Sequence, residues 1–326
     1  MDKRARVDAA LHGQPVDRPP FSLWRHFHRD DRTAATLARA TLDLARTYDL
    51  DLVKLTPCGL YAVEDWAAGH VTIPGAEHCA PFLHTPAISS PGAWRQLAPL
   101  DPSAGALARE IETVRLVAAG LPGTPLLMTL FSPLTLAYKL AGEAVVEHLR
   151  TRPADLCAGL EVLTETTIGF ARAALMAGAG GVFFATQLAR APLLSPAEYD
   201  RFGVPYDLAV LDAVATQSSI TVLHLHGTGI FFDLVDRYPV HAVSWHDRET
   251  APSLASARSR TERAFLAGLD RDLLARGPAS AIRRQVSEVL ATTKGRGLIM
   301  APSCVIPTTA PQAHLQAVRD ALLALA

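Results

Sequence analysis

Two histidines and a cysteine are the residues of this chain whose types and spacing best suit a metal ion. His224 and His226 end one short apolar run, and Cys304 ends another one later in the chain. Residues two apart in a strand point to the same side, so the two histidines face together. Imidazole and thiolate are zinc ligands, and His246 or Asp247 could complete the set. The alternative is that the histidines form hydrogen bonds or bind an anionic substrate without a metal.

A second group of charged side chains follows the first apolar run. Arg25 and Arg29 flank the sequence His-Phe-His, which includes His28. The planar guanidinium group suits bidentate recognition of carboxylate or phosphate. We therefore expect these three residues to bind an anionic substrate, the alternative being a solvated loop with surface ion pairs.

Eight apolar runs, nearly all separated by helical stretches, provide the elements that would position these residues. Strands that alternate with helices favour a parallel sheet, and eight such units form a closed β/α barrel. An open doubly wound sheet is the second choice, but no run is followed by a Gly-x-Gly-x-x-Gly turn. We expect one α/β domain over 1–326, a (β/α)8 TIM-type barrel. Its predicted strands are 21–24, 50–56, 125–131, 181–186, 219–226, 242–246, 264–270 and 297–304.

The site of such a barrel lies at the C-terminal ends of its strands. Five further residues near these ends are substrate-binding candidates, although two have alternatives. Lys54 lies inside a strand and faces either the barrel lumen or the outside, and Tyr138 either reaches the site or only lies on a helix. The five are Lys54, Tyr138, Gln187, Trp245 and Asp270.

The segment 57–100 interrupts the alternation and is rich in Pro, Gly and His. Long loops in compact domains are usually functional segments or lids. We predict that this segment is an insertion after the second strand and covers part of the C-terminal mouth.

Composition limits the classes of function. The 326 residues are 49% hydrophobic, enough for a large core, and the formal net charge of −1 argues against a nucleic-acid partner. No run of about eighteen apolar residues predicts a membrane span, and the N-terminus does not read as a signal peptide. The four cysteines show no close pairing, so we expect reduced thiols and a cytoplasmic location.

Several short motifs, in order along nearly the whole chain, resemble the uroporphyrinogen decarboxylase superfamily. This resemblance independently implies a β/α barrel. The motifs are Pro15-Val-Asp-Arg-Pro-Pro20, Leu52-Val-Lys-Leu55, Ser132-Pro-Leu-Thr-Leu136, Leu194-Ser-Pro-Ala-Glu-Tyr199, Gly268-Leu-Asp270 and Gly297-Leu-Ile-Met-Ala-Pro-Ser-Cys304.

The decarboxylase branch of the superfamily supplies the first expectation for function. Its arginine motif after the first strand is similar to Arg25-His-Phe-His-Arg29, although no acid follows the second strand and Ser303-Cys304 replaces a late histidine. The resemblance implies decarboxylation of a small anionic molecule, carboxylate-bearing and of pyrrole type or simpler, with no required cofactor. Arg25, His224, His226 and Cys304 are then the catalytic candidates.

The zinc-dependent methyltransferases of the superfamily supply the alternative. Their ligands are a His-x-Cys motif and a cysteine some eighty residues later, which His224-Leu-His226 and Cys304 resemble with His226 in place of the first cysteine. This branch implies Zn2+, a methyl group moved to a thiol or from a corrinoid, and a corrinoid protein as partner. A homodimer is left open. The third alternative is a barrel that binds a tetrapyrrole or corrinoid without catalysis.

Overall fold

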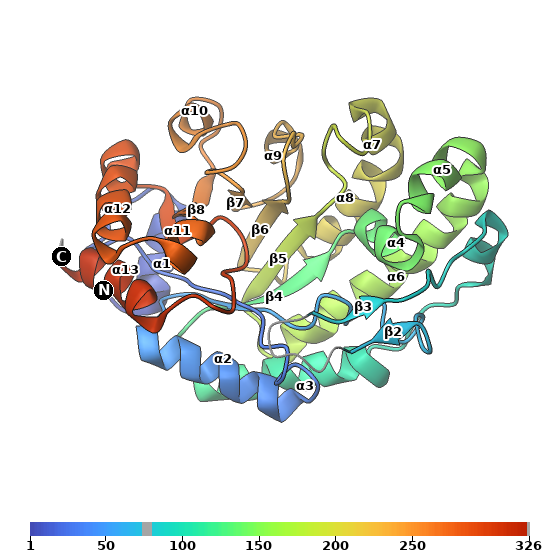
Figure 1. Ribbon diagram of the computed structural model, residues 1–326, viewed down its shortest axis with the longest axis horizontal. Coiled ribbons are helices and arrows are strands. Elements are labelled where there is room, and N and C mark those ends of the chain that lie inside the picture. Colours follow the sequence, from blue (N-terminus) through green and yellow to red (C-terminus); the bar gives the residue numbers. More distant parts are fainter. Residues whose placement is uncertain (74–79, 325–326) are drawn as a thin grey trace.

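A curled parallel sheet with helices around it forms the framework of the computed structural model, which describes residues 1–73 and 80–324 (Figure 1). The strands lie in the order β1-β4-β5-β6-β7-β8-β9, and each pairs with its neighbours in parallel. The fold class predicted from the sequence is confirmed. The strands are β1 (Val53–Leu55), β4 (Leu126–Phe131), β5 (Gly181–Thr186), β6 (Ile220–Leu225), β7 (Ala242–Trp245), β8 (Ala264–Leu269) and β9 (Leu298–Pro302).

The eighth position of the barrel is occupied by an extended segment that is not a regular strand. The Ser22 N–H donates to the Met300 carbonyl (3.0 Å) on β9, and the Asp51 N–H donates to the Phe21 carbonyl (2.9 Å) just before β1. The predicted strand 21–24 is therefore in the right place but forms only isolated bridges. One reason is that Pro20 has no N–H, and another is that the Phe21 N–H donates to the Asp51 side chain (2.9 Å).

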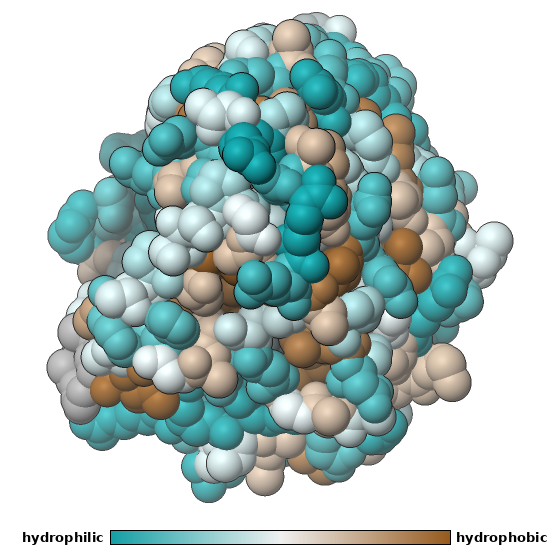
Figure 2. Space-filling view, turned by 90° about the vertical axis from the view of Figure 1, so that its right-hand side faces the viewer, coloured by the Kyte–Doolittle hydropathy of each residue, from teal (hydrophilic) through white to brown (hydrophobic). Residues whose placement is uncertain are grey.

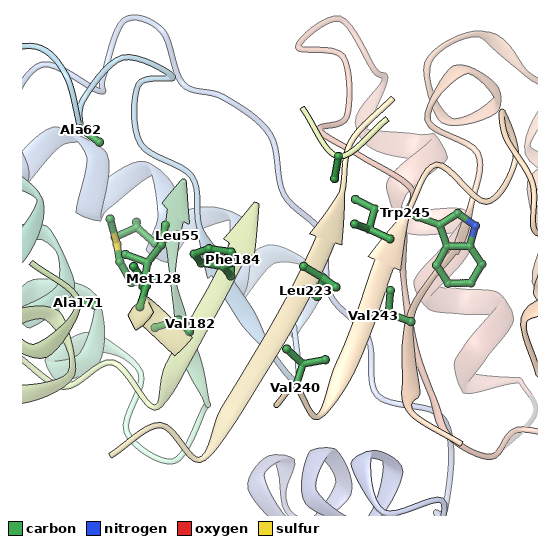
Figure 3. Close-up of a cluster of buried hydrophobic side chains, with 14 of the residues drawn as sticks. Leu55, Ala62, Met128, Ala171, Val182, Phe184, Leu223, Val240, Val243 and Trp245 are labelled. Atoms are coloured by element: carbon green, nitrogen blue, oxygen red, sulfur yellow. The ribbon is translucent and has the colours of Figure 1, made fainter. Parts of the chain in front are cut away.

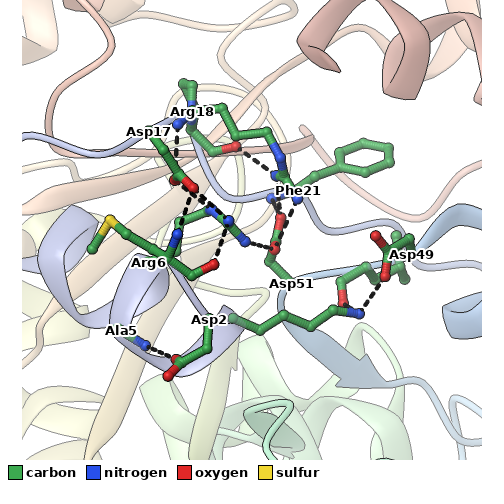
Figure 4. A network of polar contacts seen from close by, with 12 residues as sticks. Asp2, Ala5, Arg6, Asp17, Arg18, Phe21, Asp49 and Asp51 are labelled. Atoms are coloured by element: carbon green, nitrogen blue, oxygen red, sulfur yellow. Dashed lines mark hydrogen bonds and ion pairs between the residues drawn. The ribbon is translucent and has the colours of Figure 1, made fainter. Parts of the chain in front are cut away.

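A buried ion-pair network fixes this segment to the start of β1 (Figure 4). Asp51 is 0% exposed. Its carboxylate accepts from Arg6 Nη1 (2.7 Å) and Arg18 Nη1 (2.5 Å). Arg6 also donates to Asp17 (2.7 Å), so α1 (Lys3–Leu11), the 17–21 segment and β1 are held together.

Two hydrophobic cores lie on the two faces of the sheet. The outer face packs on the surrounding helices, as shown by Leu223, Val243 and Trp245 in Figure 3. The strand side chains that point to the inner face of the sheet, such as Phe183 and Val222, belong to a smaller core that also includes residues of α1. Side chains alternate along a strand, so His224 shares the inner face with Val222.

The helices lie between the strands, as the predicted alternation requires. Gly142, where φ is 62°, separates α4 from α5, and Gly203 separates α7 from α8. The helices beyond α1 are α2 (Ala34–Tyr48), α3 (Gly105–Gly120), α4 (Pro133–Ala141), α5 (Ala144–Thr151), α6 (Pro153–Met176), α7 (Pro196–Phe202), α8 (Val204–Val214), α9 (Leu234–Arg237), α10 (Leu254–Arg258), α11 (Arg271–Arg276), α12 (Ala279–Thr293) and α13 (Gln312–Leu323).

The insertion 57–100 begins at the C-terminal end of β1 and continues over the outer helices. It contains the hairpin of β2 (Val71–Thr72) and β3 (Phe82–Leu83) and the 3-10 helix η1 (Pro91–Gln96). Trp94 of η1 donates to His148 on α5 (3.0 Å) and lies so close to Gly159 on α6 that a Cβ there would collide with its ring. Its residues 74–79 are outside the described part of the chain.

The face shown in Figure 2 is mainly polar and carries hydrophobic residues in small separate groups. Within residues 1–73 and 80–324, no helix has the length and apolar character needed to cross a membrane.

Candidate metal centre and cavity

Four side chains from three strand ends converge at the mouth of the barrel. His224 lies on β6 and His226 directly follows it, His246 follows β7, and Cys304 lies two residues after β9. The Cys304 Sγ is 4.0 Å from His224 Nε2 and 3.7 Å from His226 Nδ1. His246 Nε2 is 3.3 Å from His226 Nδ1. One ligand atom from each residue lies within 4.8 Å of all the others.

These spacings fit a single zinc ion. Nitrogen at 2.0–2.1 Å and sulfur at 2.3 Å, placed tetrahedrally around one ion, are roughly 3.3–3.6 Å apart. The three contacts given above, from 3.3 to 4.0 Å, are close to that range. The donor set of three imidazoles and one thiol is also of the type zinc accepts.

Neighbouring side chains orient two of the imidazoles. His224 Nδ1 is 3.1 Å from Ser244 Oγ, and His246 Nδ1 is 3.1 Å from Glu249 Oε2. These contacts leave Nε2 of both rings directed at the other ligand atoms. Glu249 is in turn held by Arg271 (2.9 and 3.1 Å). Hydrogen bonds of this kind fix the tautomer and direction of metal-binding histidines.

Burial sets the charge state of the four residues in the absence of an ion. It lowers the pKa of His226 to about 3 and that of His224 well below its ordinary value, with further lowering from neighbouring cationic groups. Burial also lowers the pKa of His246, although Glu249 opposes the shift, and raises that of the Cys304 thiol. The imidazoles are therefore neutral at pH 7, which is the ligand form.

A cavity of about 110 Å³ adjoins three of the four residues. It contains two lysines and no carboxylate among its lining residues. Its lining is Trp24, His26, Lys54, Thr56, Pro57, Gly59, Thr129, Phe131, Lys139, Phe183, Ala185, Gln187, His224, His226, Cys304 and Val305. Burial lowers the pKa of Lys54 to about 7 and that of Lys139 to about 8.

Several of the candidates from the sequence are located in this site, but Asp247 is not. Lys54 and Gln187 line the cavity, and Lys54 faces the barrel lumen. His246 joins the ligand group, whereas Asp247 does not. The side chain of Asp247 points toward β8, where it accepts from the Gly268 N–H (3.4 Å) and pairs with Arg248 (3.3 Å).

The arginine motif lies elsewhere than expected. Neither Arg25 nor Arg29 lines the cavity. Arg25 is half-buried and donates to the Thr308 carbonyl (3.0 Å), and Arg29 is exposed. His28 stacks on His26 with ring centroids 5.1 Å apart, and it is His26 that reaches the cavity. The Arg25 guanidinium is directed at the loop after β9, and the cavity beside the histidines and Cys304 gives neither arginine a carboxylate-binding position.

Three other residues that the sequence proposed for substrate binding do not line the cavity and have contacts elsewhere in the fold. Trp245 is on the outer face of β7, where its Nε1 donates to the Pro252 carbonyl (2.8 Å) and its ring contacts Phe265. Asp270 caps α11 by accepting from the N–H groups of its first turn. Tyr138 is half-buried against the hydrophobic core outside the cavity, while the next residue, Lys139, lines it.

The sequence did not identify Ser244 and Glu249 as residues of the site, and Lys139 and His26 were not selected as substrate-binding residues. Ser244 could have been found, because it shares the inner side of its strand with His246. Lys139 arrives from α4, and His26 and Glu249 arrive from loops. No spacing rule in the sequence directs those three toward the strand ends.

Comparison with known proteins gives one family. The model described as uroporphyrinogen decarboxylase (URO-D) matches residues 2–324. Methylcobamide:CoM methyltransferase MtbA of Methanosarcina acetivorans is 23% identical over 340 residues, which is 96% of this chain and 95% of that protein. MtbA of Methanosarcina mazei is 27% identical over 195 residues, 59% of this chain and 56% of that protein.

Solved structures show the same fold. A methyltransferase from Methanosarcina mazei superposes with a TM-score of 0.84 at 21% identity and covers 99% of both chains. A B12-independent methionine synthase from Shewanella sp. W3-18-1, in complex with selenomethionine, has a TM-score of 0.58 at 13% identity, covering 94% of this chain and 96% of that one. With a family model that matches almost every residue, this chain belongs to the uroporphyrinogen decarboxylase (URO-D) family.

Proposed function

We propose that this protein is a zinc-dependent methyltransferase that moves a methyl group from a corrinoid to a thiol. The observation that carries the proposal is the convergence of His224, His226, His246 and Cys304 beside a small cavity. The two relatives, which are named methylcobamide:CoM methyltransferases, support the same chemistry.

The four residues would hold the metal, and Ser244 and Glu249 would orient two of them. A bound zinc ion supplies a Lewis-acid position that favours the deprotonated form of a thiol. One thiolate among four ligands offsets less of the ion's charge than the two of a His-x-Cys and Cys set. The site is therefore more attractive to an anionic sulfur, and the sulfur is a poorer nucleophile there than beside two thiolates.

The transfer balances without an added oxidant or reductant. The acceptor sulfur loses its proton and uses an electron pair to form the new sulfur–carbon bond. The bond between methyl carbon and cobalt breaks, and its electron pair stays with the corrinoid. The corrinoid would come from a partner protein that presents it at the mouth of the barrel.

Decarboxylation, the first expectation from the sequence, has less support. The cavity of about 110 Å³ is far smaller than a tetrapyrrole, and Arg25 and Arg29 do not line it. No carboxylate lines it to hold pyrrole N–H groups. Neither of the two relatives is named as a decarboxylase.

An assay with free methylcobalamin tests the proposal. Zinc-loaded protein is mixed with methylcobalamin and, in separate reactions, with 2-mercaptoethanol, 3-mercaptopropionate or homocysteine, and the methyl thioether is measured by mass spectrometry. We expect methylation of at least one thiol, and a loss of about a hundredfold or more in Cys304→Ala and His224→Ala. Cys157→Ala, which alters a half-buried cysteine on α6, is the matched control and should keep full activity.

Absence of any thioether above the protein-free rate would contradict the proposal. Binding of methylcobalamin without turnover in the same experiment would favour the non-catalytic alternative. Equal activity in wild type and Cys304→Ala would show that the cluster does not take part.

A further inference from the structure

A cluster of charged side chains lies behind one wall of the cavity, where three segments of the chain meet. Asp31 precedes α2, Glu64 belongs to the insertion after β1, and Glu110 lies on α3. Asp31 and Glu110 are both 0% exposed. Two arginines, Arg32 and Arg109, lie among these three carboxylates.

The two arginines do not neutralise all three carboxylates. Arg109 donates to both carboxylate oxygens of Glu64 (3.1 and 2.9 Å) and to Glu110 Oε1 (2.9 Å). Arg32 Nε lies 3.1 Å from Asp31 Oδ1. Two guanidinium groups therefore face three carboxylates, and one negative charge is left over when all three are ionised.

Buried oxygen atoms without a donor show where that surplus charge lies. Both oxygens of Asp31 and the Oε2 atom of Glu110 accept no hydrogen bond from the described residues, because the contact of Arg32 with Asp31 is an ion pair without hydrogen-bond geometry. A buried carboxylate that lacks donors is costly, and a proton removes its charge. Burial raises the pKa of Glu110 to about 7 and that of Asp31 to about 6, although Arg109 and Arg32 oppose the two shifts.

Three other titratable side chains face the cluster. Burial raises the pKa of the Cys58 thiol and raises that of the Tyr61 hydroxyl well above its ordinary value, so both groups are neutral near pH 7. His28 Nδ1 lies 3.9 Å from Asp31 Oδ2. A proton that balances the cluster is therefore held either by the carboxylates or by this imidazole.

The cluster contacts two segments that line the cavity. Arg32 Nη2 donates to Cys58 Sγ (3.4 Å), and the residues on either side of this cysteine line the cavity. His28 stacks on His26, which also lines the cavity, with ring centroids 5.1 Å apart. The cluster therefore joins the loop 25–32 to the start of the insertion directly behind the cavity wall.

We propose that the folded protein binds one proton on the Asp31–Glu110 pair and that this proton makes the order of the cavity wall depend on pH. Both carboxyl groups have a pKa in the folded protein above the ordinary values of 3.8 and 4.5, so the proton is held at low pH and is lost as pH rises through about 6 to 7. The buried negative charge that then remains weakens the contacts between the two segments. The coupling is independent of the reaction that the cavity serves.

Hydrogen exchange followed by mass spectrometry tests the coupling at pH 5.5 and pH 8.0, with rates corrected for the intrinsic effect of pH. The reporters are the segments 26–33 and 57–67, where the Asp31 N–H donates to the Phe27 carbonyl (2.9 Å) and the Tyr61 N–H to the Cys58 carbonyl (3.1 Å). The opened cluster regains ordinary pKa values, so protection of both segments should fall by about tenfold or more at the higher pH. Helix α6 reports global unfolding, and a decrease in the two segments no larger than that of α6 would overturn the proposal.

Two variants keep the shape of a protonated carboxyl group without its titration. In Glu110→Gln and Asp31→Asn, protection of the two segments should stay high at pH 8.0 and its pH dependence should fall below about threefold, because the surplus charge is absent. Glu112→Gln is the matched control, since Glu112 is exposed on the same helix, and it should behave as wild type. A wild-type pH dependence in both Glu110→Gln and Asp31→Asn would overturn the proposal. Thermal unfolding shows whether each variant is folded, and the wild-type measurement stands if either is not.

The variant His28→Gln locates the proton. We expect the wild-type pH dependence to remain in this variant, because the proton is on the carboxyl groups. Loss of the pH dependence in His28→Gln, together with its retention in Glu110→Gln and Asp31→Asn, would place the proton on the imidazole and overturn the proposal.

Discussion

The Nδ1 atom of His224 lies 3.1 Å from the Oγ atom of Ser244, its direct partner in the register of β6 and β7. This pairing turns Nε2 of the histidine toward Cys304. The strand register therefore sets the direction of a candidate ligand, and the serine on the next strand maintains it.

Loss of that hydrogen bond should weaken metal binding. Ser244→Ala leaves the His224 ring free to rotate, and we expect zinc affinity to fall about 10- to 100-fold. Competition with a chromophoric chelator measures the change. Ser22→Ala is the control, because Ser22 is also fully buried and its hydroxyl has no hydrogen-bond partner in the part of the chain that the structure describes. Unchanged zinc affinity in Ser244→Ala would show that the serine does not orient His224 for metal binding.

His246 should strengthen the metal site without being indispensable. His246→Ala leaves two imidazoles and one thiolate, the number of protein ligands found in many catalytic zinc sites. We expect zinc still to bind, but with an affinity that is lower by about tenfold or more. Competition with the same chromophoric chelator measures the change. His12→Ala, at an exposed histidine, should have no effect. An affinity equal to that of wild type would show that His246 is not a ligand.

Asp51 should be important for stability because it closes the barrel. Asp51→Ala would leave Arg6 and Arg18 without their buried partner and the Phe21 N–H without an acceptor. Removal of one partner of a buried ion pair costs about 3–5 kcal/mol. Urea denaturation should show a loss of this size, compared with less than about 0.5 kcal/mol for the exposed Asp8→Ala. A decrease in the free energy of unfolding of less than about 1 kcal/mol in Asp51→Ala would show that Asp51 does not hold the first extended segment against β1.

Asp207 should make stability depend on pH. The buried carboxylate accepts hydrogen bonds from Tyr199 (2.6 Å) and Tyr238 (2.7 Å). Burial raises its pKa from 3.8 to about 7, against the effect of the two hydrogen bonds. The folded protein then retains this proton between the two values, so its contribution to the free energy of unfolding is full below the ordinary pKa and is lost as pH rises through the folded-state value.

Asp207→Asn keeps an acceptor for the tyrosines and removes the titration. The stability of wild type relative to this variant should therefore decrease by about 1 kcal/mol or more between pH 4.5 and pH 7.5. Urea denaturation at several pH values measures the difference, with the exposed Asp212→Asn on the same helix as control. A constant difference over this range would show that Asp207 does not titrate there.

The sequence predicted the strands well because each is a short apolar run bounded by helical stretches. Seven of the eight are regular strands, and the eighth lost its regular pairing at Pro20 and at the Asp51 side chain. The alternation rule that places His224 and His226 on one face also applies to β7, where it puts Ser244 inside and Trp245 outside. The choice of Trp245 as a substrate-binding residue was inconsistent with that rule.

The remaining differences come from tertiary structure. Arg25 follows the first extended segment as expected, but its direction is set by a carbonyl near the C-terminus, at Thr308. Lys139 reaches the cavity because Pro133 and Ser132 start α4 directly after β4. Neither direction can be read from residue spacing, since each depends on how a loop or helix packs.

X-ray absorption at the zinc edge tests the central claim most directly. Protein expressed in zinc-supplemented medium should contain about one zinc ion per chain. Its first shell should fit about three nitrogen atoms at roughly 2.0–2.1 Å and one sulfur atom at roughly 2.3 Å, with the sulfur lost in Cys304→Ala. Less than about a tenth of an equivalent of zinc, or a shell without sulfur in the wild type, would contradict the metal centre assigned to His224, His226, His246 and Cys304.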